Sequence, residues 1–583
     1  MPRFDAFCGP FNTTFSPNVQ SEYTMNWLAE PNAVTTEGQG TEQHDKNVRC
    51  ALIRLPGLKT FVTLPNAPCR GVFPGEFRLF AVGGDHYYEI QAGGTIIDRS
   101  VPGFSGSSGI GTAGGTIGND GRPVLWFQNG KQVLLISAGQ AYCDSGNGPV
   151  PCEYSTPLTD LVIDSADSTG KTLTTATGNF FDSTDVGLQI QLTGGSGFNL
   201  FTRITIASVN SDGEAIGASS WGTPGSTLGT GVEWTGNPVT ASYGGFLDGY
   251  GYIVPSPRTK DVFFSQAPDG TDDFTMWDPL NFFVKAAYPD NVMAMYADHE
   301  ELYVMGDLEC TEVFRNVGDA NNPFMPDPGA NMHVGVQAPF SVWRLGNGVA
   351  WIGQDTRRGT RRAIHAVGYQ PQAVSTPAVQ AAWAKYAEID DAVSYTMTMG
   401  GHELWVISFP SANATWYYDA TTNFWGQWGF WNGSSWDRHK VMYHCVVALD
   451  GHTDVHYGGD WNTGQIYTMS MDYKTDDGAP IARRRRAPHN TNENQRRFYA
   501  RFEIDCDVLG LQRVFWNRLG NGRDRIWQMD SIQTSETAGV ILKLMFSDDR
   551  TQTWQNMFTQ TLDPSVDVQL ANAYLKWVDA TWN

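Results

Sequence analysis

The segment from Tyr296 to Val374 decides the fold: it reads YADHEELYVMGDLECTEVFRNVG over Tyr296–Gly318, NMHVGVQAPFSVWRLGNGVAWIGQD over Asn331–Asp355 and RAIHAVGYQPQAV over Arg362–Val374. Short runs of β-branched, aromatic and other apolar residues end repeatedly at Gly or Asp, as in ELYVMG and VAWIGQD. Such runs predict strands, and their close spacing predicts antiparallel hairpins. No helical period persists, so the segment predicts one to two blades of a radially repeated β structure, which is typical of a scaffold.

The same pattern extends along the chain on both sides. GEFRLFAVGGDHYYEI (Gly75–Ile90) has two apolar runs around a Gly-Gly-Asp turn, and VLWFQNGKQVLLIS (Val124–Ser137) has two around Asn129-Gly130, a strong hairpin signal. Weak repeats of roughly 40 to 60 residues built from short strands predict a β-propeller. We therefore expect an all-β fold with a six-bladed β-propeller, and seven blades is the alternative count.

The pattern divides the chain into four parts. The propeller body is predicted over residues 61–155 and 238–470. Residues 156–237 are rich in Thr, Gly and Ser and predict an inserted small β module, which projects outward from a hairpin tip. Residues 471–583 begin with a basic, polar stretch and continue as alternating strands, which predicts a C-terminal domain resembling a β-sandwich or barrel.

The first 60 residues are irregular and polar, and they predict an extended N-terminal arm. Phe15, Tyr23 and Trp27 are its candidate aromatic anchors. Docking on a neighbouring subunit and packing on the chain's own body both remain open.

One segment has a helical pattern. In Ser375–Val393, Thr376 is a candidate N-cap, Pro377 occupies the first helical position, and apolar residues recur every three to four positions. We expect a helix over this segment, in a connection between blades.

Composition limits the classes of function. The 583 residues predict about two to four domains. Asp and Glu number 61 against 39 Lys and Arg, which gives a net charge of −22. A surface this acidic repels phosphate, which argues against reading or storing nucleic acid. A duct through which DNA slides with few contacts remains compatible with it.

The N-terminal sequence MPRFDAFCGPFNTT has no apolar signal core, and no run of about 20 apolar residues predicts a membrane span. We therefore expect synthesis in the cytoplasm, where thiols remain reduced. Cys143 and Cys152 are close enough in CDSGNGPVPC to close a disulfide loop if oxidised, but the reduced form is the favoured prediction.

Several motifs in a fixed order give the most specific signal in the sequence. They are FSPNVQSEYTMNWLAEP (Phe15–Pro31), FLDGYGYIVPSPRTKDVFFSQAPDGT (Phe246–Thr271), ELYVMGDLECTEVFRNVG (Glu301–Gly318), NPF (Asn322–Phe324), APFSVWRL (Ala338–Leu345), VAWIGQD (Val349–Asp355), GYQPQAVST (Gly368–Thr376), HELWVISFPSANATWYYDATTNFWGQW (His402–Trp428) and GAPIARRRRAPH (Gly478–His489). In these motifs the chain resembles the phage stabilisation proteins of short-tailed phages, also called tail hub or nozzle proteins. The 156–237 insertion and the order of the C-terminal strands depart from the family pattern.

The resemblance implies a structural virion protein located in the tail and synthesised in the host cytoplasm. It implies a homohexameric ring below the portal and the head-to-tail adaptor protein, which extends the DNA channel and retains the packaged genome until ejection. It also implies contacts with tail fibre, tailspike or tail needle proteins and transient contact with viral DNA in the lumen. No enzymatic activity, cofactor or metal is expected. The alternatives are a propeller that degrades host polysaccharide and a receptor-binding protein that uses the 156–237 insertion.

Three motifs suggest chemistry but favour structural roles. Ser547–Trp554 resembles the Asp-box turn of sialidase propellers, which is itself structural. Ser165–Thr172 resembles a P-loop but lacks its first glycine and lies among Thr-rich strands. A loose histidine cluster predicts solvated loop residues more than a metal site; its members are His439, His444, His452 and His456.

The chain has two concentrated basic patches, and we expect them to pair with acidic patches on a neighbouring subunit. Their members are Arg357, Arg358, Arg361 and Arg362 in the first, and Arg483, Arg484, Arg485 and Arg486 in the second. A ring of charge facing DNA and a solvated turn are the two alternatives.

Overall fold

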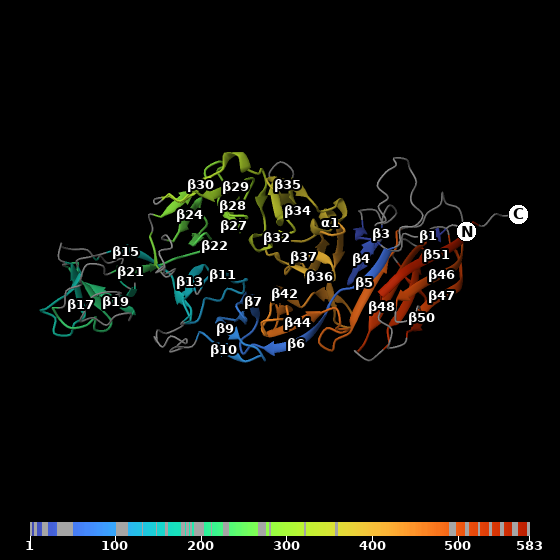
Figure 1. The fold of residues 1–583 in the computed structure, drawn as a ribbon, viewed down its shortest axis with the longest axis horizontal. Coiled ribbons are helices and arrows are strands. Elements are labelled where there is room, and N and C mark those ends of the chain that lie inside the picture. The colour runs from blue at the N-terminus through green and yellow to red at the C-terminus, as the bar shows by residue number, and fades with distance from the viewer. Residues whose placement is uncertain are drawn as a thin grey trace. The chain divides into compact units, whose positions relative to one another are not determined.

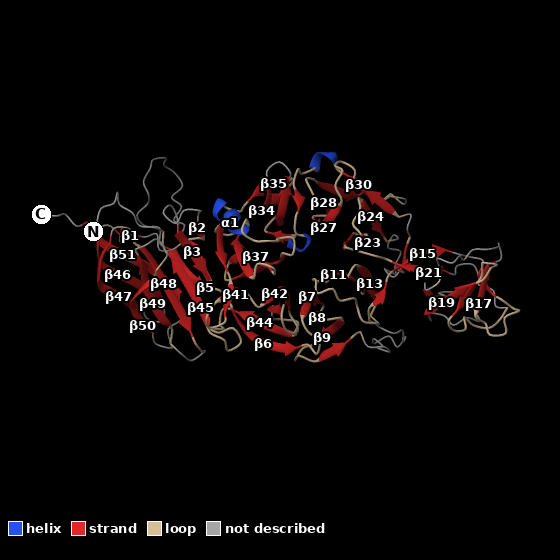
Figure 2. Ribbon diagram, turned by 180° about the vertical axis from the view of Figure 1, so that it is seen from behind, coloured by secondary structure: helices blue, strands red, loops and turns tan. Residues whose placement is uncertain are grey.

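The structure of the 583-residue chain is a computed structural model. It describes residues 3–4, 9–13, 21–31, 50–100, 115–130, 132–146, 148–157, 161–175, 181, 186, 189–191, 203–211, 213–225, 233–265, 276–278, 281–319, 322–355, 359–488, 497–507, 512–522, 525–535, 539–548, 553–562 and 569–579. Strands dominate these residues, and helices are few and short (Figure 2). The expected all-β class is confirmed.

Antiparallel meanders of mostly four strands make up most of the described chain (Figure 1). The first four sheets contain β7 (Cys69–Gly75), β8 (Arg78–Gly83), β9 (His86–Ile90) and β10 (Ile96–Asp98); β11 (Leu125–Asn129), β12 (Gln132–Ser137), β13 (Gln140–Asp144) and β14 (Val150–Pro151); β22 (Tyr243–Leu247), β23 (Tyr250–Val254), β24 (Asp261–Phe264) and β26 (Phe282–Val284); and β27 (Val292–Asp298), β28 (Glu301–Gly306), β29 (Thr311–Asn316) and β30 (Phe324–Pro326).

Three further sheets continue the series. They contain β31 (Gly335–Val336) and β32 (Trp343–Leu345), which both pair with β33 (Gly348–Asp355), then β34 (Gly359–Val367) and β35 (Gln370–Ala373); β36 (Val393–Met399), β37 (His402–Phe409), β38 (Ala414–Asp419) and β39 (Phe424–Gln427); and β42 (Val441–Val447), β43 (Val455–Asp460) and β44 (Gln465–Ser470), which β6 (Gly57–Thr63) completes. The described residues thus hold seven blade-like sheets, which is the alternative count and not the favoured six.

The first strands of neighbouring sheets contact one another within each of the two compact units of the chain. In the unit of Gly84–Glu89 and Ile96–His333, β22 contacts both β11 and β27. In the unit of Met1–Gly83, Ile90–Thr95 and Val334–Asn583, β36 contacts β32 and β42, and β42 contacts β7. Side-by-side first strands are the arrangement of propeller blades.

The insertion region forms a small sheet of its own. β16 (Leu161–Ile163), β17 (Thr172–Thr175), β18 (Gln189–Gln191), β19 (Arg203–Val209) and β20 (Ala215–Gly217) pair in one five-stranded sheet. Trp221 is fully buried, and its indole N–H donates to the Lys171 carbonyl at 2.6 Å. The strands β15 (Glu153–Pro157) and β21 (Glu233–Pro238) flank the module and pair with each other, so the chain enters and leaves it side by side.

Both ends of the chain contribute to the same sheets. In one sheet the order is β4 (Trp27–Pro31), β5 (Cys50–Arg54), β51 (Gln569–Asp579), β46 (Arg497–Asp507) and β47 (Gln512–Gly522), and β1 (Arg3–Phe4) also pairs with β51. In a ten-stranded sheet, β3 (Ser21–Met25) joins β39 to β45 (Ile481–Arg486), followed by β48 (Ile526–Gln533), β49 (Ile541–Ser547) and β50 (Gln555–Thr561); β2 (Asn12–Thr13) pairs with β3. The described part of the N-terminal stretch is therefore sheet, where an irregular arm was expected.

The helix begins as expected but is shorter. α1 spans Pro377–Trp383, and the Thr376 hydroxyl accepts from the Val379 N–H at 3.3 Å as its N-cap. Arg361 donates through Nη1 to the carbonyls of Trp383 and Tyr386, at 2.8 and 2.7 Å. A cation that satisfies the carbonyl of the last helical residue stabilises the helix end at Trp383, whereas the sequence pattern predicts continuation to Val393.

Candidate functional site

The arginine run Arg483–Arg486 forms the last four residues of β45, between the N-terminal strand β3 and the C-terminal strand β48. Side chains alternate between the two faces of a strand. Arg483 and Arg485 are accordingly buried, with 2% and 0% of their surface exposed, whereas Arg484 and Arg486 are half-buried. The four guanidinium groups therefore act mostly inside this chain.

Arg485 holds the N-terminal segment. Its Nη1 donates to the Pro10 carbonyl at 3.0 Å and to the Thr24 hydroxyl at 2.8 Å, and its Nη2 donates to Glu22 at 3.1 Å. Burial raises the pKa of Glu22, although the Arg485 charge opposes this rise. A buried charge requires partners of this kind, so the guanidinium of Arg485 fixes the first strands of the chain against β45.

The other three arginines contact different segments. Arg484 forms a bidentate pair with Asp530, its cross-strand neighbour on β48, at 2.9 and 2.8 Å. Arg483 lies over the Trp27 ring at 5.5 Å, and Arg486 lies over Trp554 at 4.8 Å. Burial, and then the nearby Arg484 charge, lower the pKa of Arg486 to about 10. The strand β45 thus connects N-terminal and C-terminal segments through charge and aromatic contacts.

Asn26 makes the corresponding connection to the propeller sheets. Its backbone is left-handed (φ 59°), a conformation that Asn tolerates better than most residues. The amide of Asn26 donates to the carbonyls of Gly429 and Ala482, at 2.7 and 2.9 Å, and accepts from the Gly429 N–H at 2.8 Å. The Tyr417 hydroxyl donates to the carbonyl of the next residue, Trp27. Asn26 therefore connects its own segment to those of Gly429 and Ala482 through buried hydrogen bonds.

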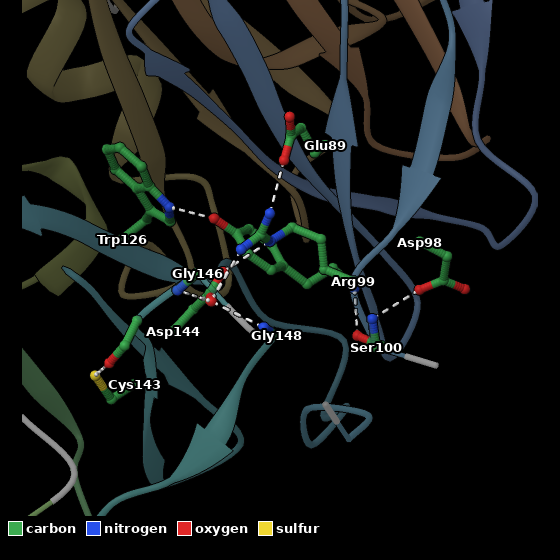
Figure 3. Close-up of polar contacts among 11 residues, drawn as sticks. Glu89, Asp98, Arg99, Ser100, Trp126, Cys143, Asp144, Gly146 and Gly148 are labelled. Carbon is green, nitrogen blue, oxygen red and sulfur yellow. Dashed lines mark hydrogen bonds and ion pairs between the residues drawn. The ribbon is translucent and has the colours of Figure 1, made fainter. Parts of the chain in front are cut away.

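A second buried charged cluster lies in the other compact unit (Figure 3). Arg99 donates to Glu89 at 2.7 Å and to both carboxylate oxygens of Asp144, at 2.8 and 3.0 Å. Asp144 also accepts from the N–H groups of Gly146 and Gly148. Burial lowers the pKa of Arg99, but the carboxylates outweigh this effect and raise it overall. The cluster joins β9 to β13, and thus joins two neighbouring sheets.

The predicted N-terminal anchors have different positions in the structure. Phe15 lies outside the described residues, as do Arg357 and Arg358. Trp27 is fully buried. Tyr23 is half-buried and packs edge-on against Phe11, with ring centroids 5.8 Å apart. The two described anchors therefore pack on this chain itself, which was the second of the two alternatives.

The described arginines of the two basic patches are buried or half-buried. Arg361 is half-buried and is occupied by the end of α1, and Arg362 is half-buried on β34. In the second patch, Arg483 and Arg485 are buried within this chain, whereas Arg484 and Arg486 are half-buried. The sequence shows four successive arginines, but it does not show that their strand pairs with β3, or that the N-terminal segment supplies the partners of Arg485.

The remaining motifs have structural roles in the described residues. In the P-loop-like segment, Asp167 accepts from the N–H groups of Thr169, Lys171 and Thr172 at 2.8 to 3.0 Å and orders a turn between β16 and β17. A nucleotide-binding loop leads into a helix instead. In the Asp-box-like segment, Asp548 binds Arg525 at 2.8 and 3.0 Å.

The histidines divide between core and surface. His444 and His456 are joined by one hydrogen bond of 3.0 Å, His439 packs on Trp428 at 4.1 Å between ring centroids, and His452 lies in an exposed turn. Burial, and then the neighbouring His456, lower the pKa of His444 to about 3. Within the described ranges, no three His, Cys, Asp or Glu side chains converge as metal ligands. Cys143 and Cys152 are both buried.

Among the described helices, none combines the length and apolar character needed to cross a membrane. Taken together, the repeated four-stranded sheets and their side-by-side first strands define a β-propeller protein. Residues 251–474 match the family model described as "Bacteriophage P22 Gp10, beta-propeller". The match confirms the predicted resemblance to the phage stabilisation family over this part of the chain, and that resemblance suggests a phage structural protein.

Comparison with curated proteins gives no match. Among solved structures, the computationally designed protein Ika8 is similar with a TM-score of 0.31 and 9% identity, over 70% of this chain and 99% of that chain. PorZ, from the type-IX secretion system of Porphyromonas gingivalis, has a TM-score of 0.25 and 9% identity, over 88% of this chain and 80% of that chain. Hsv2p of Kluyveromyces lactis has a TM-score of 0.23 and 7% identity, over 62% and 97%.

Proposed function

We propose that this chain is a nozzle or tail-hub subunit in the virion of a short-tailed phage. Copies of the chain form a ring, six in number by resemblance, below the portal and its adaptor protein. The ring extends the DNA channel and retains the packaged genome until ejection. The observation that carries this proposal is the family match over residues 251–474, which runs from within β23 through β44.

The internal connections of the chain suit this mechanical role. The ten-stranded sheet runs without interruption from β36 through β3 to the C-terminal strands. A load on the C-terminal sheet therefore passes to the propeller sheets through backbone hydrogen bonds and the buried Arg485 contacts. Paired strands resist deformation because bending them breaks several hydrogen bonds together.

The charge of the chain suits contact with moving DNA. A net charge of −22 disfavours lasting phosphate contacts, so DNA passes the wall of the channel without binding to it. The mechanism is steric and electrostatic, and no catalytic step is part of it. Head-to-tail adaptor proteins and tail fibre, tailspike or tail needle proteins are the proposed neighbours.

The small inserted module favours a second role for one part of the chain. It has its own five-stranded sheet and its own buried tryptophan, and it joins the rest through two paired strands. A module of this kind suits adhesion to a host surface. Deleting residues 158–232 and measuring adsorption tests this role: adsorption falls while assembly persists if the module binds the host, and adsorption is unchanged if it does not.

Genome retention is the direct test of the main proposal. Particles assembled without this chain should fill with DNA and then release it, so their DNA becomes sensitive to added nuclease. Supplying the full chain in trans should restore protection, and supplying the chain without residues 158–232 serves as a matched control that keeps the propeller. Particles that protect their DNA equally well without the chain contradict the proposal.

A further inference from the structure

A small cleft lies beside the arginine strand, within a single compact unit. One wall is the hairpin of β40 (Gly429–Trp431) and β41 (Trp436–Arg438), and the other is the sheet of β45, β48 and β49. Trp431 and Trp436 form the aromatic wall, with ring centroids 5.0 Å apart. The strands place side chains on the opposite wall in two rows.

The strand registers define these rows. Arg484 pairs with Asp530, and Asp530 pairs with Lys543, so these side chains form a charged row across three strands. Ile532 pairs with Ile541 in the next row of the same face, which is apolar. The cleft therefore offers a cation next to an apolar surface and two indole rings.

Two residues that line the cleft, Trp436 and Lys543, carry hydrogen-bond donors. Arg484 and Asp530 neutralise each other in their bidentate pair, whereas Lys543 is exposed. The Trp436 indole N–H is buried, and the described residues supply it with no hydrogen-bond acceptor. An ammonium group and an indole N–H are both donors, so they fit a carboxylate oxygen. The apolar row and the rings fit an apolar side chain beside that carboxylate.

We propose that this cleft receives an acidic side chain, with an apolar neighbour, from a second copy of this chain. The argument for a second copy is charge: each copy has 61 acidic against 39 basic residues, so its surface offers many carboxylates to the few exposed cations. The inference rests on the proposed function, because the ring places copies of the chain side by side. It adds the surface through which one copy holds the next.

Cross-linking of mixed isotopes tests this contact. Full-length chain labelled with ¹⁵N is mixed with unlabelled chain, treated with a carbodiimide that joins amines directly to carboxylates, and digested for mass spectrometry. We expect linked peptides in which Lys543 of one isotope is joined to an Asp or Glu of the other. Lys543 linked only within one isotope, or not linked at all, overturns the proposal.

A charge-reversal pair tests its energetic weight. Lys543→Glu should weaken self-association about tenfold or more in sedimentation velocity, because it places like charges together. Lys59→Glu is the matched control: Lys59 is exposed on β6, outside the cleft, and its substitution changes the net charge equally. Equal association of the two variants, or a wild-type chain that stays monomeric, overturns the inference. If Lys543→Glu leaves self-association unchanged while particles still retain their DNA, the proposed function stands and only this contact is ruled out.

Discussion

Replacing Arg485 with methionine should release the N-terminal strands from the sheet that they complete. The substitution keeps an unbranched side chain that fills the inner part of the site, but it removes the guanidinium and its bonds to Pro10, Thr24 and Glu22. It also leaves the Glu22 carboxylate largely buried without its cation. Breaking a buried pair by removal of one partner costs about 3 to 5 kcal/mol, and we expect a loss of this size in the free energy of unfolding.

Calorimetry measures this loss in the transition that contains β3 and β45. A chain of this size unfolds in more than one step, so the transitions are resolved and compared individually. For a cooperative unit of roughly 150 to 250 residues, 1 kcal/mol shifts Tm by about 2 to 4 °C. The Arg485→Met variant should therefore unfold roughly 6 to 20 °C earlier in that transition. Limited proteolysis should cut its N-terminal segment first.

The control is the neighbouring residue on the same strand. Arg484→Met also removes a cation, but the Arg484 side chain is 29% exposed in its pair with Asp530, so the loss should be nearer to about 1 kcal/mol. The double variant Arg485→Met/Glu22→Leu should recover part of the stability, because the uncompensated carboxylate is gone. Equal losses for Arg485→Met and Arg484→Met would refute the reasoning.

Three further substitutions test other buried groups. Burial, and then the neighbouring His456, lower the pKa of His444 from 6.5 to about 3, so the native state binds a proton less readily than the unfolded chain does. The contribution of His444 to stability is therefore full above pH 6.5 and falls toward pH 3. In urea unfolding, His444→Gln should reduce this fall by up to about 1.4 kcal/mol per pH unit. Burial raises the pKa of Asp476 to about 7, so stabilisation by its bound proton is present below pH 3.8 and is lost as pH rises through 7; Asp476→Asn should raise Tm at pH 8 and not at pH 4. Arg99→Met should lose about 3 to 5 kcal/mol because Glu89 and Asp144 remain buried, whereas Arg122→Met in an exposed loop should change stability by no more than about 0.5 kcal/mol.

Local signals in the sequence predicted local structure well. The Asn129-Gly130 turn joins β11 to β12, with Gly130 at φ 55°, and Thr376 caps α1 as expected. These features depend on residues next to one another, so a short pattern contains the necessary information. The end of α1 depends instead on Arg361, which is distant in sequence, and the helical pattern could not show it.

Long-range pairing was the part that the sequence did not reveal. Tyr23 pairs with Arg486 across most of the chain, and Gln465 pairs with Thr63 to complete the last blade-like sheet. Neither partner contains a local sign of the other. The arginine run therefore looked like an exposed basic patch, since the strand that pairs with it and the partners of Arg485 come from the opposite end of the chain. The favoured count of six blades has a different cause: the segment Tyr296–Val374, predicted as one to two blades, contributes to two sheets, that of β27–β30 and that of β31–β35.

Electron cryo-microscopy of virions that contain this chain tests the central claim most directly. The account predicts density for its propeller and C-terminal sheets in a closed ring on the tail axis, below the portal, with DNA running through the ring. Density for the chain away from the tail axis, or a channel wall that contains no density for the chain, would contradict the account.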